Sequence, residues 1–215
     1  MLEEMAQFFE ARLDGYDEHM RTELDTENEF YPFTASQLPV GPVHVLDLGC
    51  GTGLELEDYF QRNTEAEITG IDLTEGMLEA LRAKFPDKKL HLIQGSYFDE
   101  PLPENTFDAA VSVESLHHFT EEQKTGLYEK LWRSLKDGGY FILTDYFADD
   151  DADEAHWFDE LARIKKEQQI TDDAFYHYDT PLTPEHEARC LRNAGFTEVA
   201  FLAQWGSTWT LKAVK

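Results

Sequence analysis

The sequence has 215 residues, and its 44 acidic and 18 basic side chains give a formal net charge of −26 at pH 7. Hydrophobic residues make up 41% of the chain, which is enough for a packed core, so the charge does not indicate disorder. Nucleic-acid binders gain affinity by neutralising phosphates with Lys and Arg. The densest basic run, Arg163, Lys165 and Lys166, lies between Glu160 and Glu167. The composition therefore disfavours nucleic acids and anionic membrane surfaces as partners.

The cysteines and the first residues bear on location. Cys50 and Cys190 lie far apart and have no metal-type spacing, so the sequence suggests neither a disulfide framework nor a zinc site. Residues 1–10 mix acids into their apolar positions and lack the basic flank of a signal peptide. No apolar run approaches the roughly 20 residues of a membrane span. We expect a cytoplasmic protein with no membrane partner.

The elements follow one another in a pattern typical of a parallel sheet wrapped by helices. Residues 1–40 are helical, acidic and aromatic, and we interpret them as a cap on the same domain. Strands are predicted at residues 43–48, 67–72, 90–94, 107–113 and 140–145, and helices at residues 55–63, 75–85 and 121–135. Most of these strands are continuous apolar runs, as expected for strands that are covered on both faces.

Sequence features mark where the later helices and strands begin and end. Thr120 and Gln123 predict a capping box at the start of the third helix, and Gly138 offers the left-handed conformation that ends a helix. An acidic stretch then leads into a helix that runs to residue 170, and a polar, aromatic loop follows it. Pro184 begins a last helix. Strands at residues 198–203 and 208–214 have a short link, which predicts an antiparallel hairpin.

A glycine-rich loop joins the first predicted strand to the first predicted helix. Gly49, Gly51 and Gly53 allow backbone N–H groups to approach a ligand, and the helix N-terminus favours a negative group; a plain glycine turn is the alternative. Asp72 ends the next strand, where doubly wound folds hold ribose hydroxyls with an acid. A nicotinamide loop would read G-x-G-x-x-G. This one reads G-x-G-x-G, with Leu54 in place of the third glycine.

Four ordered stretches extend this pattern: VLDLGCGTG at 45–53, GIDL at 70–73, FDAAV at 107–111 and LKDGGY at 135–140. Together they resemble class I S-adenosylmethionine-dependent methyltransferases of the small-molecule type. The resemblance implies a Rossmann-like, doubly wound α/β fold whose seven-stranded sheet is mostly parallel with an antiparallel C-terminal hairpin. The single domain, residues 1–215, would comprise the helical cap (1–40), a cofactor-binding core (43–146), a lid insertion (147–182) and a C-terminal helix and strand pair (183–215).

The same resemblance assigns residues to the cofactor. Asp47 would receive its ammonium group, although it could also be an acid that stabilises the turn, and Asp72 would bind both ribose hydroxyls. Met77 would pack on adenine unless it is simply core. The family often has an acid where Ser96 stands, which leaves the adenine contact open. The full predicted set is Tyr16, Asp47, Gly49, Cys50, Gly51, Gly53, Asp72, Leu73, Met77, Ser96, Tyr97, Glu114 and Ser115.

Methyl transfer from a sulfonium needs little beyond alignment of nucleophile and methyl group, and a base only if the acceptor loses a proton. For that case His118 is the first choice and Asp145 the second, because imidazole titrates near neutral pH; the histidine pair could also only brace its loop. Adjacent histidines do not share a helix face, so no metal site is predicted. Substrate contacts are expected from Tyr31, His117, Tyr146 and Tyr178, in a lid whose aromatic residues could also be ordinary packing.

The leading function is therefore methylation of a small, neutral or cationic acceptor on O, N or S. Two alternatives stay open. One is a methyltransferase of tRNA or protein, of which the charge disfavours the RNA substrate. The other is a module that binds S-adenosylmethionine without transfer. The sequence does not decide the oligomeric state, and a homodimer stays open.

Overall fold

The computed structural model describes residues 1–23, 27–172 and 174–215, and their strands form one seven-stranded sheet. The strand order is β3-β2-β1-β4-β5-β7-β6. Strands β1 to β5 pair in parallel, and β7 runs antiparallel to both β5 and β6. The strands are β1 (His44–Leu48), β2 (Glu67–Asp72), β3 (Lys89–Gln94), β4 (Phe107–Val113), β5 (Leu135–Tyr146), β6 (Glu198–Trp205) and β7 (Thr208–Val214). The expected doubly wound sheet with its antiparallel C-terminal hairpin is confirmed.

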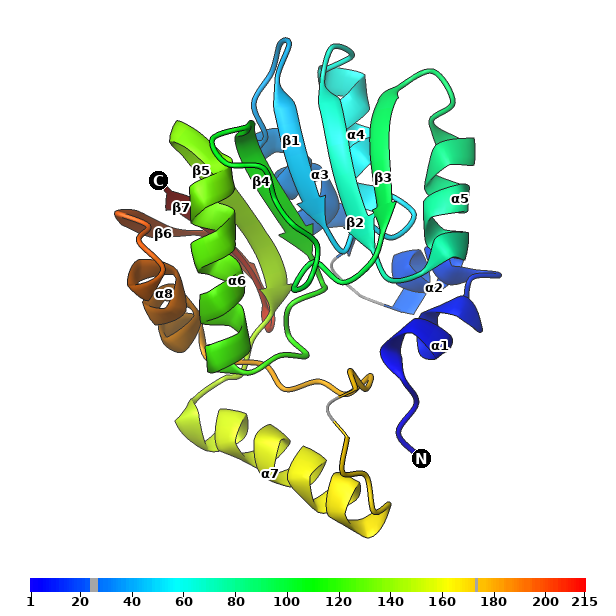
Figure 1. The fold of residues 1–215 in the computed structure, drawn as a ribbon, viewed down its shortest axis with the longest axis vertical. Helices are drawn as coiled ribbons and strands as arrows, with labels where there is room; N and C mark the ends of the chain where they lie inside the picture. The colour runs from blue at the N-terminus through cyan, green and yellow to red at the C-terminus, as the bar shows by residue number, and fades with distance from the viewer. Residues whose placement is uncertain (24–26, 173) are drawn as a thin grey trace.

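Helices cover both faces of this sheet (Figure 1). They are α1 (Met5–Glu10), α2 (Tyr16–Glu23), α3 (Glu27–Gln37), α4 (Leu54–Arg62), α5 (Glu75–Lys84), α6 (Glu121–Ser134), α7 (Asp151–Glu167) and α8 (Pro184–Asn193). Successive side chains of β1 point to opposite faces of the sheet, so this strand contributes to two separate parts of the core. Val45 packs with the buried residues of α3, α4 and α5, whereas Leu46 and Leu48 pack with those of α6 and α8. Each strand of the sheet centre is thus buried on both sides, which explains its continuous apolar sequence.

The predicted capping box at Thr120 and Gln123 is present, but the end of α6 differs from the prediction. The helix stops at Ser134, and Leu135 is already extended because it pairs with Phe107 as the first residue of β5. Gly138 does have a positive φ of 76°, but it lies in an irregular part of β5 and not at the helix end. Pairing with β4 therefore replaces the glycine as the reason why the helix stops.

The N-terminal segment and the insertion after β5 meet at the end of the sheet where the parallel strands finish (Figure 1). Backbone hydrogen bonds join them: Met5 donates to Phe175 O at 2.9 Å, and His177 donates to Glu3 O at 3.0 Å. No helix among the described residues is long and apolar enough to cross a membrane. Helix α7, which has no buried residue, extends from this end of the molecule.

Candidate active site

A cavity lies at the carboxyl ends of β1, β2 and β4. Ligands of doubly wound folds bind at this position, where the strand order reverses between β1 and β4. The residues that line it are Met5, Phe9, Tyr16, Gly49, Gly51, Asp72, Met77, Val113, Glu114, Ser115 and His118. Eight of them were predicted from the sequence, and Met5, Phe9 and Val113 were not.

The glycine loop owes its shape to glycine itself. Gly49 has a φ of +72°, and a Cβ there would lie 2.1 Å from Ser115 Oγ. Gly51 and Gly53 also have positive φ values, of 46° and 73°. These are left-handed conformations that residues with a Cβ rarely adopt. Gly49 and Gly51 line the cavity, and Gly53 lies behind them against Leu81. The N–H groups of these glycines donate to Ile71 O, Asp72 Oδ2 and Cys50 O within the protein, so their approach to a ligand stays a prediction.

Asp72 lies at the end of β2 with both carboxylate oxygens engaged by backbone. Oδ2 accepts from Gly51 N and Oδ1 from Thr74 N, both at 2.9 Å. Burial raises the pKa of Asp72, and these two hydrogen bonds act in the opposite direction. Because a carboxylate offers about four lone-pair sites, each oxygen can still accept a further hydrogen bond from a hydroxyl in the cavity.

Two further acidic residues, Asp47 and Glu55, lie on either side of the glycine loop in the sequence. Asp47 is 1% exposed and contacts Glu55, which is 5% exposed. Burial, followed by the charge of Glu55, raises the pKa of Asp47, and burial also raises that of Glu55. Asp47 Oδ2 and Glu55 Oε1 have no hydrogen-bond partner among the described residues. Unpartnered buried acids are costly, and a cationic group would satisfy both free oxygens. Neither side chain lines the cavity, so the contact of Asp47 with an ammonium group stays a prediction.

Several residues assigned to the cofactor lie outside the cavity wall. Cys50 is buried against β2, where a Cβ on Gly70 would lie 2.7 Å from its Sγ. Ser96 Oγ accepts from Phe98 N at 3.2 Å within its own turn. The Tyr97 hydroxyl donates to Ser115 O at 3.1 Å and thus supports the wall from behind. Leu73 packs against the core on the α6 side. The adenine contact among Ser96, Tyr97 and backbone groups stays a prediction.

Helix α2 is held against the glycine loop. Thr52 Oγ1 donates to Asp17 Oδ1 at 2.5 Å, and Lys84 Nζ lies 2.6 Å from Asp17 Oδ2. These contacts fix Tyr16, whose ring faces that of Phe9 edge-on with 6.3 Å between centroids, at the cavity wall. Burial raises the pKa of the Tyr16 hydroxyl, with the charge of Asp72 next in size. The N-terminal cap therefore encloses the cavity from the α2 side.

The paired histidines lie in a turn after β4 and not in a helix, so the helix-face argument does not decide whether they can share a ligand. His117 Nδ1 lies 2.5 Å from Asp145 Oδ1. Burial favours the neutral ring, but the charge and hydrogen bond of Asp145, together with Asp179, raise the pKa of His117 to about 10. Asp145 is 1% exposed and also accepts from the backbone N–H groups of Leu116 and Tyr146. It positions His117 and is too enclosed to serve as the second-choice base.

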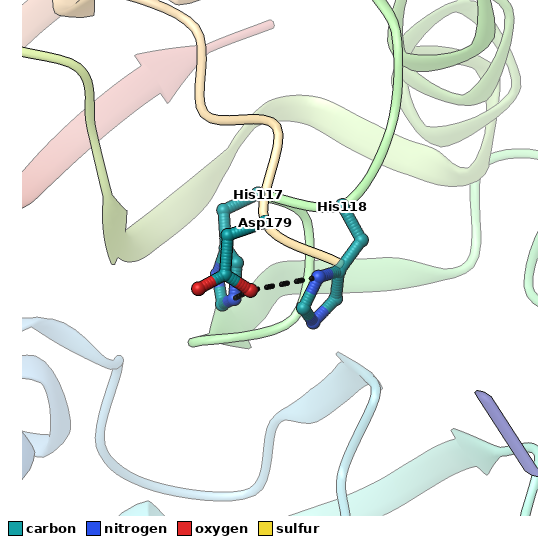
Figure 2. A group of neighbouring side chains, drawn as sticks. All are labelled: His117, His118 and Asp179. Carbon is teal, nitrogen blue, oxygen red and sulfur yellow. Dashed lines mark ion pairs between the residues drawn. The ribbon is translucent and has the colours of Figure 1, made fainter. Parts of the chain in front are cut away.

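His118 borders the cavity. Its Nδ1 lies 3.1 Å from Tyr178 O and 3.3 Å from Asp179 Oδ1 (Figure 2). Burial lowers the pKa of His118, and the charge of His117 lowers it further, so the ring is neutral near pH 7. Asp179 was not predicted from the sequence, because the insertion brings it here from a distant part of the chain. The position of His118 supports its prediction as a base.

Glu114 follows β4 with a φ of +48°, a strained value for a residue with a side chain. Burial, then the charge of Asp145, raises the pKa of Glu114 to about 7. Thr208 Oγ1 donates to Glu114 Oε1 at 3.1 Å. Strained backbone and a perturbed carboxyl group at one position are typical of functional sites.

The tyrosines predicted to touch substrate lie in different surroundings. Tyr146 faces His117 edge-on at 6.1 Å between ring centroids. Tyr178 lies 6.3 Å from the ring of Trp157, beside α7. Tyr31 is buried against Phe30 in the core between α3 and α4, away from the cavity, so that assignment is not supported. Its apolar surroundings explain the difference, since aromatic composition alone does not separate core from lid.

The fold and the site together define an α/β enzyme that binds an adenosyl cofactor. Residues 45–139 match the family described as a methyltransferase domain. An uncharacterised methyltransferase of Geobacillus sp. (strain WCH70) is 30% identical over 216 aligned residues, which cover 100% of this chain and 96% of that protein. The chain belongs to the class I S-adenosylmethionine-dependent methyltransferases, and its cofactor is S-adenosylmethionine.

Two further comparisons extend this result. Demethylmenaquinone methyltransferase of Symbiobacterium thermophilum is 38% identical over 104 residues, covering 46% of this chain and 41% of that enzyme. Human N-acetylserotonin methyltransferase, solved with S-adenosylmethionine, superimposes with a TM-score of 0.64 at 21% identity, covering 98% of this chain and 55% of that one. At that identity the likeness establishes the fold alone.

Proposed function

We propose that the enzyme transfers the methyl group of S-adenosylmethionine to a small, largely apolar acceptor, on an O, N or S atom. One observation carries this proposal: the N-terminal segment and the insertion join above the cavity. Phe8 stacks on His177 with 3.6 Å between ring centroids and 7° between planes, and His177 lies 4.9 Å from the ring of His118. A roof of this kind favours a small molecule over a folded protein or RNA.

The chemistry of the roof supports an acceptor without strong negative charge. Burial lowers the pKa of His177 to about 4, so its stacked ring is neutral. Acidic groups of Glu114 and Asp179 lie 3.9 and 3.5 Å from the ring nitrogens of His117, and they would repel an anion. The demethylmenaquinone methyltransferase among the relatives bears a name that indicates an apolar acceptor.

Both cysteines are free thiols, which supports a reducing cytoplasm as the location.

The residues would divide the work of binding and alignment. Backbone groups of the glycine loop and Asp72 would hold the sugar and amino-acid parts of the cofactor, and Asp47 with Glu55 would face its ammonium group. S-adenosylmethionine supplies a methyl group that is activated by the sulfonium charge. Tyr16 and His118 would close the site against water. If the acceptor carries a removable proton, the neutral His118 ring would accept it.

The test is release of S-adenosylhomocysteine from S-adenosylmethionine incubated with a cell extract that ultrafiltration has divided into small and large molecules. We expect product with the small-molecule fraction, and much less with Asp72→Ala when S-adenosylmethionine is present near its dissociation constant. Asp87→Ala, which changes an exposed acid, is the matched control and should behave as the unaltered protein. Product only with the macromolecular fraction would favour a tRNA or protein substrate. No product with either fraction would favour a module that binds without transfer.

A further inference from the structure

Three side chains with metal-binding atoms converge next to the cofactor cavity. Asp179 Oδ1 lies 3.5 Å from His117 Nε2 and 3.3 Å from His118 Nδ1 (Figure 2). The three donor atoms all lie within 4.8 Å of one another. The histidines come from the turn after β4, and the aspartate comes from the insertion before α8.

The separations match those of ligands around one ion. Two ligands at about 2.0 to 2.1 Å from a tetrahedral zinc ion lie about 3.4 Å apart, and the two measured separations from Asp179 Oδ1 are 3.3 and 3.5 Å. The other contact of His117 is different: its Nδ1 lies 2.5 Å from Asp145 Oδ1. That separation fits a hydrogen bond, which places the metal-binding atom of His117 at Nε2.

The surroundings of His117 have the form of an outer ligand shell. A metal-binding histidine usually donates its second ring N–H to a carboxylate, which orients the ring and increases its basicity. Asp145 occupies that position, and it is itself fixed by the backbone N–H groups of Leu116 and Tyr146 at 2.8 and 3.0 Å. The Asp179 side chain is 45% exposed, so an ion can reach the cluster from solvent.

We propose that His117 Nε2, His118 Nδ1 and Asp179 Oδ1 bind one divalent transition metal ion of the zinc type. Two imidazoles and one carboxylate are a ligand set suited to zinc and its neighbours. On binding, the ion replaces the proton on His117 Nε2, and the proton that His118 Nδ1 donates to Tyr178 O moves to His118 Nε2. His118 is then a ligand and no longer a base. Whether the purified enzyme holds metal therefore decides which of these two roles it plays.

Three protein ligands leave a position for a further ligand, as in catalytic zinc sites. An acceptor hydroxyl or thiol that binds there loses its proton to solvent more readily. Its lone pair then forms the bond to the methyl carbon while the carbon–sulfur bond electrons return to sulfur. This use of the ion rests on the proposed methyl transfer, whereas binding of the ion does not. The acceptor class would be small molecules with an ionisable O–H or S–H group.

The test is calorimetric titration of the chelator-treated full-length protein with zinc chloride alone. We expect one tight site, and Asp179→Asn should weaken it by about 100-fold or more, since even outer-shell changes cost 10- to 100-fold. Cobalt(II) should give the strong visible absorption of a tetrahedral ion, and Asp179→Asn should remove it. Circular dichroism checks the fold, and His118→Gln provides a second variant with the same expected loss.

A matched control is a histidine–carboxylate cluster away from the cavity, where His186 Nδ1 lies 2.9 Å from Glu154 and Nε2 3.6 Å from Asp151. His186→Gln should leave the tight site unchanged. The proposal is wrong if the unaltered protein binds no zinc tightly, if folded Asp179→Asn and His118→Gln proteins bind it equally well, or if His186→Gln abolishes the site. Zinc binding as expected without release of S-adenosylhomocysteine would contradict the proposed transfer and leave the metal site in place.

Discussion

Asp72 offers the most direct perturbation of cofactor binding. Its two oxygens accept from Gly51 N and Thr74 N at 2.9 Å, and the carboxylate borders the cavity. Asp72→Ala removes the acceptor for two ribose hydroxyls, and a hydrogen bond to a charged group contributes about 1.5 to 3 kcal/mol. Loss of even one such bond corresponds to about tenfold weaker binding. We therefore expect the dissociation constant for S-adenosylmethionine to rise at least tenfold.

Isothermal titration calorimetry measures this change, with Asp87→Ala as the control for an exposed acid. The variant also frees two backbone N–H groups of the loop, so thermal unfolding must show that it is folded at the assay temperature. Unchanged affinity in a folded Asp72→Ala protein would refute the assignment. Measurable binding of NADH would also contradict it, because the loop lacks the nicotinamide pattern.

Four other predictions follow from the site. Glu55→Gln should raise the melting temperature of the cofactor-free protein more at pH 7 than at pH 5. Burial raises the pKa of Glu55, so this acid stabilises the fold fully only below its pKa in the unfolded chain, and that stabilisation is lost as the pH rises through its pKa in the folded protein. The same variant should bind S-adenosylmethionine more weakly. Gly49→Ala should cost about 1 to 3 kcal/mol, measured by denaturant unfolding, because its Cβ would meet Ser115 Oγ at 2.1 Å in a left-handed backbone; an unchanged midpoint would contradict the loop geometry. Asp17→Asn should speed hydrogen exchange of residues 8–22, and equal exchange with and without cofactor in the unaltered protein would contradict the closing cap. His118→Gln should retain cofactor affinity while turnover of the true acceptor falls about 100-fold or more, and a normal rate would make His118 structural.

The sheet could be predicted because its strands are short apolar or alternating runs bounded by turn residues, and such runs can be recognised without knowledge of the partner strand. Residues 67–72, 107–113 and 208–214 agree with β2, β4 and β7. The end of α6 could not be predicted in this way. Leu135 pairs with Phe107 from a strand far away in sequence, and such pairing overrides the local glycine signal.

The residues of the candidate site also differ in whether the local sequence could predict them. Gly49, Gly51 and Asp72 lie next to strand ends, so the sheet topology alone brings them together. Glu55 was missed because an acid in the first turn of a helix is ordinarily solvated, and only the packing of α4 buries it. Asp179 was missed because its approach to the histidines depends on the path of the insertion. Residues placed by distant segments thus needed the structure.

The destination of the methyl group tests the central claim most directly. The enzyme would be incubated with S-adenosylmethionine carrying a deuterated methyl group and with a filtered metabolite extract, and the products analysed by mass spectrometry. We predict a labelled small molecule formed in step with S-adenosylhomocysteine, and its loss in the Asp72→Ala variant but not in Asp87→Ala. Label found only in RNA or protein of an unfiltered extract, with none in any small molecule, would contradict the account.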